Sequence, residues 1–381
     1  MSLLNQRCKS WSIYWPRKRG KIMKNGTLKR LNSLDVNATN LDELRQGPTE
    51  LRIEVTRKCP LECLHCSACS NSGNDLQLKT EQIIAAVTDF RSMGGDRVII
   101  TGGEPLVHPE LMSVLESLKD IGIRPILFTS GITGKSEYCR SLDEVEIKRL
   151  RPLLSSIVFS LYGKSASVHE YITQRQYSFA MTLHAIQKAI RLGIPTDIHF
   201  VPMKVNYQDL AGIANIARSI GIEKVRVLRF VPHGRAEEYA SELLPSEEDY
   251  VKFAMITRMA RERYPDLLQI GAAFRGIVPD ITKTCSAAYD KLVVTADGSV
   301  APCDGFKNLQ DSNDNWNINV KSLSEIYASS PLFTSIRAIK TDLARHGQSC
   351  CYCMAQKAVS QACVSCDILS STTPVFTQAR S

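Results

Sequence analysis

The sequence of 381 residues predicts an α/β fold: a parallel sheet, open or curled into a partial barrel, followed by a small cysteine-rich domain. The first observation is a set of apolar, β-branched runs that read as strands, at 51–57, 97–101, 125–129, 156–161, 196–201 and 224–230. The second is a set of segments with helical period that lie between and after these runs, at 80–93, 108–120, 143–151, 179–192, 206–220 and 246–263. Six strands that are each followed by a helix predict a parallel sheet.

Small, polar and thiol-bearing residues follow the predicted strands. Cys59 comes two residues after the first strand, and TGGEP (101–105) follows the second. TSG (129–131) ends the third strand, and SLYG (160–163) ends the fourth. In folds of this class the chemistry collects at the C-terminal ends of the strands, so these segments predict one shared site.

The third observation is that the alternation of strands and helices ends at about residue 272. LVVTADGSVAPC (292–303) reads as two short strands around an Asp-Gly turn, and helical turns are expected at 321–328 and 331–340. A cysteine-dense piece at 349–366 and a Ser/Thr-rich tail at 367–381, expected to fray, end the chain.

Composition limits the class of protein. Hydrophobic residues make up 44% of the chain and charged residues 23%, as in an ordinary soluble protein. No apolar run reaches the roughly eighteen residues of a membrane span, and the N-terminus lacks the pattern of a secretory signal. The 13 cysteines are therefore expected in a reducing compartment, the cytoplasm, as metal ligands or catalytic thiols rather than disulfides.

The positive charge is concentrated in an N-terminal extension, predicted to span residues 1–48 and to be partly ordered. Residues 1–34 hold nine Lys or Arg and no acid, whereas the rest of the chain has 38 basic residues (47 minus nine) against 39 acidic ones. Trp11, Tyr14 and Trp15 lie among these charges. Such a tail suits an acidic peptide or an anionic surface, and a merely solvated extension is the alternative; nucleic acid is a weaker candidate and no membrane partner is expected.

Cys59, Cys63 and Cys66 have the spacing C-x3-C-x2-C. Structural zinc sites pair two close ligands with a distant second pair, so three close cysteines make an unusual half-site for zinc. Cuboidal iron–sulfur clusters normally take four thiolates, and three would leave one iron open. This spacing, followed one strand–helix unit later by Gly102-Gly103-Glu104-Pro105, resembles the radical SAM superfamily over roughly residues 50–235.

The resemblance implies a partial (βα)6 TIM-like barrel at 49–270 and a set of cofactor-binding residues. Cys59, Cys63 and Cys66 would ligate a [4Fe–4S] cluster whose open iron chelates S-adenosylmethionine. His65 would lie against the adenine, and Gly102, Gly103, Glu104 and Pro105 would meet the methionine amino group. Ser130 and Ser160 would contact the ribose or the carboxylate, and Arg175, which a surface role would also explain, would bind the carboxylate. Cys69 has no part in the three-ligand pattern.

The C-terminal cysteines resemble the SPASM/twitch extension, here expected at 271–366. The residues that match are Cys285, Cys303, Cys350, Cys353, Cys363 and Cys366. They imply one auxiliary [4Fe–4S] cluster, with a second as an open alternative. The gap between the last two pairs is longer than in the full pattern, and zinc bound by the two C-x2-C pairs is the competing interpretation.

The resemblance implies reductive cleavage of S-adenosylmethionine to a 5′-deoxyadenosyl radical that abstracts hydrogen from a substrate. The expected substrate is a ribosomally made peptide, and the expected electron donor is a flavodoxin or a ferredoxin. Oxidation, epimerisation or decarboxylation of a small molecule (a sugar, an aminoglycoside or a cofactor precursor) is the alternative. A non-enzymatic iron–sulfur or zinc-binding scaffold is an alternative of another class.

Overall fold

The computed structural model describes residues 47–281, 285–307 and 316–345. The described residues include the whole of the predicted barrel at 49–270 and part of the predicted C-terminal domain at 271–366. The predicted N-terminal extension up to residue 46, the predicted tail at 367–381 and the cysteines at 350, 353, 363 and 366 lie outside them.

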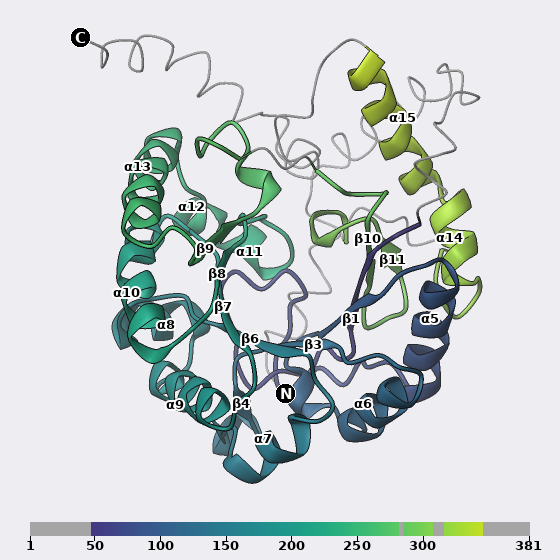
Figure 1. Cartoon of the computed structure of the whole chain (residues 1–381), viewed down its shortest axis with the longest axis horizontal. Coiled ribbons are helices and arrows are strands. Elements are labelled where there is room, and N and C mark those ends of the chain that lie inside the picture. The colour runs from purple at the N-terminus through teal and green to yellow at the C-terminus, as the bar shows by residue number, and fades with distance from the viewer. Residues whose placement is uncertain (1–46, 282–284, 308–315, 346–381) are drawn as a thin grey trace.

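A curved sheet of nine strands is the centre of the molecule, with helices along its outer face (Figure 1). Its strands lie in the order β11-β10-β1-β2-β3-β6-β7-β8-β9. Their bounds are β1 (Glu50–Glu54), β2 (Arg97–Thr101), β3 (Ile126–Thr129), β6 (Ser156–Ser160), β7 (Thr196–Phe200), β8 (Val225–Val227), β9 (Leu268–Ile270), β10 (Lys291–Val294) and β11 (Val300–Ala301). Among the described strands of this sheet, only β10 and β11 pair antiparallel; every other neighbour is parallel.

The six predicted strands are confirmed as β1, β2, β3, β6, β7 and β8, with some of their ends shifted. The six predicted helices are confirmed too, with slightly shifted ends: α5 (Thr80–Ser92), α6 (Leu111–Asp120), α7 (Glu144–Leu150), α9 (Ser178–Arg191), α10 (Leu210–Ile220) and α13 (Glu247–Arg263). The apolar side chains that gave these helices their period, such as Phe90 and Ile186, are buried in the main core. The parallel α/β class therefore follows from local pattern alone.

Several short elements were not expected. A seventh parallel strand, β9, follows α13 and pairs with β8. An extra helix, α8 (Ala166–Thr173), precedes α9, and a small hairpin of β4 (Ile132–Thr133) and β5 (Arg140–Ser141) follows β3. The short helices α11 (Arg235–Glu238) and α12 (Ala240–Leu243) lie between β8 and α13. Elements of two to eight residues carry too little periodic pattern to be recognised in a sequence.

The C-terminal hairpin extends the sheet of the barrel. The hairpin expected at 292–303 is present as β10 and β11, and β10 pairs in parallel with β1, with Leu51 opposite Leu292. The helices α14 (Leu323–Ser329) and α15 (Pro331–Arg345) confirm the helical turns expected there. Sheet and core run continuously across the boundary expected at residue 270. Residues after the hairpin are thus held beside β1, next to the cysteine loop.

Candidate active site

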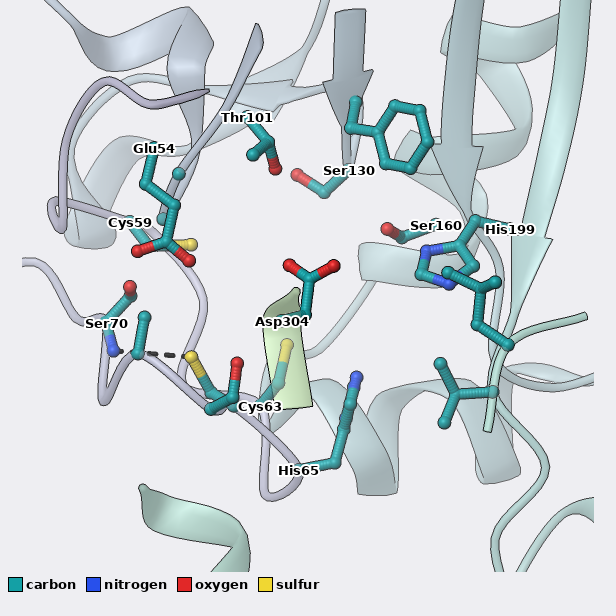
Figure 2. Close-up of a pocket in the computed structure, with 18 of the residues that line it drawn as sticks. Glu54, Cys59, Cys63, His65, Ser70, Thr101, Ser130, Ser160, His199 and Asp304 are labelled. Carbon is teal, nitrogen blue, oxygen red and sulfur yellow. Dashed lines mark hydrogen bonds between the residues drawn. The ribbon is translucent and has the colours of Figure 1, made fainter. Parts of the chain in front are cut away.

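A cavity of ≈ 250 Å³ lies where the strands of the curved sheet end (Figure 2). Its lining includes most of the residues predicted to bind the cluster and the cofactor: Cys59, Cys63, His65, Cys66, Gly102, Gly103, Glu104, Ser130 and Ser160. These residues follow or end β1, β2, β3 and β6, so the parallel order of the strands brings them together. The predicted shared site at the strand ends is therefore present.

The three cysteines sit on a loop that is tied down by main-chain hydrogen bonds. The amide of Cys59 donates to the carbonyl of Asn71 (3.0 Å), and the amide of Cys66 donates to the carbonyl of Cys63 (3.1 Å). Two further amides point at sulfur atoms, from Leu61 to Cys59 Sγ (3.4 Å) and from Ser70 to Cys66 Sγ (3.3 Å). Donors directed at sulfur stabilise a thiolate, which is the form that binds metal.

When no metal is bound, the surroundings of Cys59 and Cys63 disfavour their thiolate forms. Burial, with a smaller contribution from Cys63, raises the pKa of Cys59 well above its ordinary value. Burial, followed by the neighbouring Cys66, raises the pKa of Cys63 to about 12. Both therefore stay protonated at neutral pH unless a cation compensates the thiolate, as ligated iron does.

The arrangement fits a cuboidal cluster better than a single ion. In the described parts of the chain, no three His, Cys, Asp or Glu side chains are placed to hold one metal ion. A cuboidal cluster makes a different demand, because each thiolate binds a separate iron atom. Three thiols on one short loop, lining one cavity, meet that demand and leave one iron for another ligand.

Gly102 and Gly103 allow the second strand end to pack against the cysteine loop. A Cβ atom on Gly102, whose φ is +153°, would lie 2.5 Å from the carbonyl oxygen of Thr56. A Cβ on Gly103 would lie 2.4 Å from the carbonyl oxygen of Lys58. The amide of Gly103 donates to the Thr56 carbonyl (2.6 Å), and that of Glu104 donates to the Lys58 carbonyl (2.9 Å). The glycines thus have a packing role in addition to the close approach to a ligand that the sequence suggested.

Glu104 is fully buried and its carboxylate is held by four donors. Oε1 accepts from the hydroxyl of Thr129 (2.5 Å) and from the amide of Leu106 (3.2 Å). Oε2 accepts from the amide (2.8 Å) and the hydroxyl (2.6 Å) of Ser130. Burial raises the pKa of Glu104, against the lowering effect of these hydrogen bonds. Glu104 therefore links the ends of β2 and β3 and also opens the short 3-10 helix that begins at Pro105.

His65 points into the cavity (Figure 2). Its ring meets that of Tyr162 edge to face, with centroids 4.3 Å apart. Burial, and then the charge of Arg235, lowers the pKa of His65 to about 4, so the ring is neutral at physiological pH. Its Nδ1 atom is shielded from solvent and has no hydrogen-bond partner among the described residues. A neutral aromatic ring with a free nitrogen suits contact with a heterocyclic ligand.

Arg175 and Pro105 do not line the cavity. The guanidinium of Arg175 donates to the carbonyl of Pro60 (3.1 Å), at the start of the cysteine loop. Pro105 is buried and begins the short 3-10 helix that Glu104 caps. Cys69 has a φ of +51°, and its amide donates to the carbonyl of Cys66 (3.4 Å). The predicted cofactor contact of Arg175 stays a prediction, and its observed contact supports the loop.

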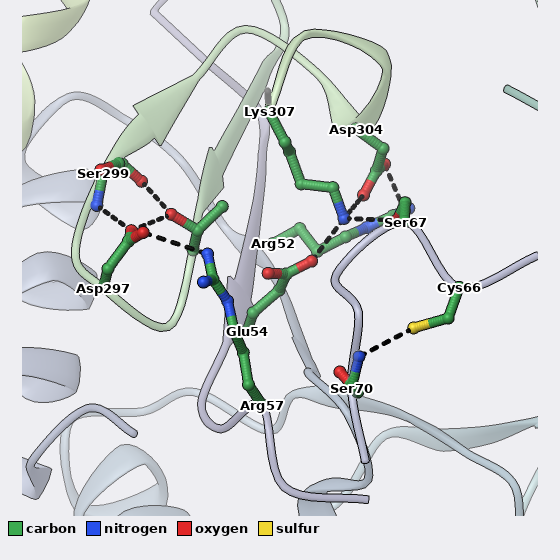
Figure 3. A network of polar contacts seen from close by, with 11 residues as sticks. Arg52, Glu54, Arg57, Cys66, Ser67, Ser70, Asp297, Ser299, Asp304 and Lys307 are labelled. Atoms are coloured by element: carbon green, nitrogen blue, oxygen red, sulfur yellow. Dashed lines mark hydrogen bonds and ion pairs between the residues drawn. The ribbon is translucent and has the colours of Figure 1, made fainter. Parts of the chain in front are cut away.

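Besides Arg229, four charged residues of the cavity wall were not predicted. Arg52 and Glu54 come from β1, and Asp304 and Lys307 come from the segment after the C-terminal hairpin (Figure 3). Arg52 pairs with Asp304 (2.5 Å), and Lys307 pairs with Glu54 and donates to the hydroxyl of Ser67 (3.0 Å). Burial would raise the pKa of Asp304, but the charges of Arg52 and Lys307 lower it to about 2. The alternation of Arg52 and Glu54 along one strand was the only available signal.

His199 was also missed. It lies on β7, one strand beyond the predicted residues, and its ring points into the cavity (Figure 2). Burial, and then the charge of Arg52, lowers the pKa of His199 to about 3. Its Nε2 atom has no hydrogen-bond partner within the described part of the chain. A single histidine in a strand gives no sequence signal of its own.

Of the predicted auxiliary ligands, only Cys285 and Cys303 are described. Both are half-buried against the main core and neither forms a disulfide. Cys303 directly precedes Asp304, so an auxiliary cluster held by Cys303 would adjoin the charged wall of the cavity. Cys350, Cys353, Cys363 and Cys366 lie outside the described residues, and their ligation stays a prediction.

Comparison with known proteins identifies two domains in this chain. A family model of the radical SAM superfamily matches residues 53–217, which hold the cysteine loop, the GGEP segment and the strand ends. The chain belongs to the radical SAM superfamily. A model of the SPASM iron–sulfur cluster-binding domain matches residues 285–366, which contain the predicted auxiliary cysteines. This radical SAM protein is therefore an enzyme that uses S-adenosylmethionine and iron–sulfur clusters.

The similarity to curated relatives extends over about three quarters of this chain. PqqA peptide cyclase of Methylorubrum extorquens (strain PA1) is 24% identical over 294 residues, which cover 76% of this chain and 74% of the relative. AdoMet-dependent heme synthase of Methanosarcina barkeri (strain Fusaro / DSM 804) is 24% identical over 314 residues, 77% and 86% of the two chains.

The fold is similar to that of Streptococcus suis SuiB bound to precursor peptide SuiA. The TM-score is 0.68 at 15% identity, covering 90% of this chain and 85% of SuiB. The likeness confirms the curled parallel sheet of a partial barrel. In the part of the chain that the structure describes, no helix has the length and apolar character needed to cross a membrane.

Proposed function

We propose that this radical SAM enzyme modifies a ribosomally made peptide. The observation that carries the proposal is its similarity to PqqA peptide cyclase across three quarters of both chains. The fold shared with SuiB, which was solved with its precursor peptide, supports the same substrate class. The basic N-terminal extension, with nine Lys or Arg in residues 1–34 and no acid, would favour an acidic peptide segment.

The shape of the sheet is compatible with a bulky substrate. The edge strands β9 and β11 do not pair with each other, so the described sheet does not close into a full barrel. A peptide could enter through such an opening, with the reacting residue beside the cavity. Arg52 and Lys307 form ion pairs with Asp304 and Glu54. Their charges therefore stabilise the cavity wall and are not available to bind an acidic peptide.

The cofactors would be held by the residues that line the cavity. Cys59, Cys63 and Cys66 would ligate the [4Fe–4S] cluster, and Cys285 and Cys303 would contribute to an auxiliary cluster. When bound, the [4Fe–4S] cluster supplies the electron that cleaves S-adenosylmethionine, and the resulting 5′-deoxyadenosyl radical takes a hydrogen atom from the substrate. The protein's own contribution is to position the reactants and exclude water, since such a radical attacks any nearby C–H bond.

Individual side chains suggest how S-adenosylmethionine would be oriented. The ring of His65, with its free Nδ1, would contact the adenine, and Ser160 would contact the ribose. Glu104 would keep Ser130 and the backbone of Gly102 and Gly103 in place for the methionine part. The electron would come from a flavodoxin or a ferredoxin in the cytoplasm, where thiols and clusters remain reduced.

Cleavage of the cofactor is the first test. Anaerobically reconstituted, reduced protein should convert S-adenosylmethionine to 5′-deoxyadenosine and methionine. Alanine at Cys59, Cys63 and Cys66 together should abolish the conversion. Cys69→Ala is the matched control, because Cys69 lies on the same loop outside the three-ligand pattern, and it should retain most activity. Normal cleavage by the triple variant would overturn the ligand assignment.

The substrate class is tested separately. The test substrate is a short peptide encoded beside this gene, incubated with the enzyme, S-adenosylmethionine and reductant. If a new covalent link forms, the peptide should lose two hydrogens, and mass spectrometry would detect the lower mass. Similarity to the heme synthase favours one alternative, a small cofactor precursor. Turnover of tetrapyrrole precursors with no change in any such peptide would replace the peptide proposal with this alternative.

A further inference from the structure

The segment that follows β8 packs against the cysteine loop. The amide of Arg235 donates to the carbonyl of Cys66 (3.0 Å). Gly234, with a φ of +62°, lies so close that a Cβ atom would be 2.5 Å from the carbonyl oxygen of Ser67. His233 Nε2 contacts the carbonyl of Gly305 at 2.7 Å, next to Asp304. This segment thus touches both the cysteine loop and the wall that follows Cys303.

The side chain of Arg235 bridges two points of the cysteine loop. One guanidinium nitrogen donates to the carbonyl of Cys63 (2.8 Å) and another donates to the carbonyl of Ser70 (2.7 Å). With the Cys66 contact, a single residue holds three carbonyls in the stretch that carries two of the three predicted ligands. Arg235 is only 9% exposed, so the contacts are shielded from water.

Arg235 lacks the partner that a buried arginine normally has. Within the described residues, no carboxylate lies within ion-pair distance of its guanidinium, in contrast to Arg52 with Asp304. Leaving a buried charge uncompensated is costly. A cluster ligated by Cys63 and Cys66 would bring thiolate charge close to this guanidinium, and that charge would supply the missing counter-charge.

We propose that Arg235 is a positioning residue that holds the cysteine loop and compensates the negative charge of the loaded [4Fe–4S] cluster, making the cluster easier to reduce. The inference rests on the assignment of Cys59, Cys63 and Cys66 to this cluster. The cluster gains one further negative charge on reduction, and a fixed cation nearby stabilises the reduced form more than the oxidised form. Arg235 also keeps Cys63 and Cys66 in place before the cluster binds.

The two roles can be separated by substitution in the full-length, anaerobically reconstituted enzyme. Arg235→Gln removes the charge and shortens the side chain. Arg235→Lys keeps the charge, but one ammonium group cannot reproduce the fork that bridges the Cys63 and Ser70 carbonyls. The matched control is Lys58→Gln, because Lys58 directly precedes Cys59, yet its side chain is 41% exposed and paired with Asp75. Solvent screens a charge in that position.

The readout is a reductive titration followed by electron paramagnetic resonance, using the part of the signal that changes on addition of S-adenosylmethionine. At the potential where half of the wild-type cluster is reduced, Arg235→Gln should show a ratio of reduced to oxidised cluster lower by roughly tenfold. Arg235→Lys should remain close to wild type in this ratio, but should lose iron to a chelator faster. Lys58→Gln should match wild type in both measurements.

The outcomes distinguish this inference from the assignment on which it rests. A wild-type protein without a signal sensitive to S-adenosylmethionine would overturn both. A wild-type signal with the same titration and the same iron loss in Arg235→Gln would overturn only the role of Arg235. If Arg235→Gln does not fold, Arg235→Lys decides the matter: faster iron loss supports the loop-holding role, and wild-type iron retention contradicts it.

Discussion

Lys307 compensates a buried glutamate, so replacing it with methionine should destabilise the protein measurably. The side chains of Lys307 and Glu54 are 7% and 5% exposed, and they are paired across the junction between β1 and the segment after the C-terminal hairpin. Removing one member of a buried pair costs about 3–5 kcal/mol, because the other charge stays buried without a partner.

The cost in Lys307→Met has an upper limit, since the abandoned Glu54 can take up a proton. Holding an ordinary glutamate protonated at pH 7 costs about 3.7 kcal/mol, from a pKa of about 4.3 and ~1.36 kcal/mol for each pH unit. The expected destabilisation at pH 7 is therefore roughly 3–4 kcal/mol. It should shrink by up to ~1.4 kcal/mol for each unit that the pH is lowered towards 5, because protonation then costs less.

Thermal unfolding measures this loss. An unfolding entropy of about 2.1 cal/mol/K per residue gives ~0.8 kcal/mol/K for the chain of 381 residues, if it unfolds as one unit. The Tm of Lys307→Met should therefore fall by about 4–5 °C at pH 7. Lys252→Met is the matched control, because the pair of Lys252 and Glu248 is 52% and 77% exposed. Its Tm should change by less than ~1 °C.

The double variant Glu54→Gln, Lys307→Met completes the test. It removes both charges and should recover most of the lost Tm, since no unpaired charge remains buried. A Tm of Lys307→Met within ~1 °C of wild type would refute the reasoning. So would a double variant that is no more stable than Lys307→Met alone, because the loss would then come from packing and not from the stranded charge of Glu54.

Three further outcomes are expected. Gly102→Ala should lower stability by roughly 1–3 kcal/mol and reduce the iron content of the reconstituted protein, because its Cβ would meet the Thr56 carbonyl at 2.5 Å; unchanged iron content and Tm would contradict this. Burial, and then His65, lowers the pKa of His169 to about 3, so stability should fall as the pH drops below about 6.5, where only the unfolded state binds the proton. His169→Gln should flatten that slope between about pH 6.5 and 5 by up to ~1.4 kcal/mol per unit, and an equal slope in both proteins would count against it. Alanine at all three ligands of the cysteine loop should leave a brown protein with roughly four iron atoms per chain from the auxiliary cluster, whereas a colourless protein with bound zinc would favour the structural zinc interpretation.

The order of the barrel elements and much of the site were predictable from short-range pattern. Strand and helix periods are local properties, so the six strands and six helices could be read directly. The positions of Cys59, Gly102, Ser130 and Ser160 after or at the ends of parallel strands then brought them to one edge of the sheet, whatever the details of packing. The spacing of residues along the chain was enough to predict this convergence, because each set of predicted cofactor-binding residues lies within one loop or at one strand end.

Other features depended on contacts between distant parts of the chain. The pairing of β10 with β1 joins residues about 240 positions apart, and no local pattern encodes such a partner. The same long-range contact places Asp304 and Lys307 against Arg52 and Glu54, which in the sequence are four ordinary charged residues.

The surroundings of the cysteine loop show the same division. The sequence by itself determined that three thiols, a glycine-rich turn and two serines would meet at the strand ends, since each follows a strand of recognisable period. Only the tertiary structure decided that Gly102 and Gly103 make room for the backbone of the cysteine loop. It also decided that Arg235, some 170 residues later, donates hydrogen bonds to carbonyls of this loop. Close packing and the need to compensate buried charge act between surfaces brought together by folding, so they leave no periodic trace in the chain.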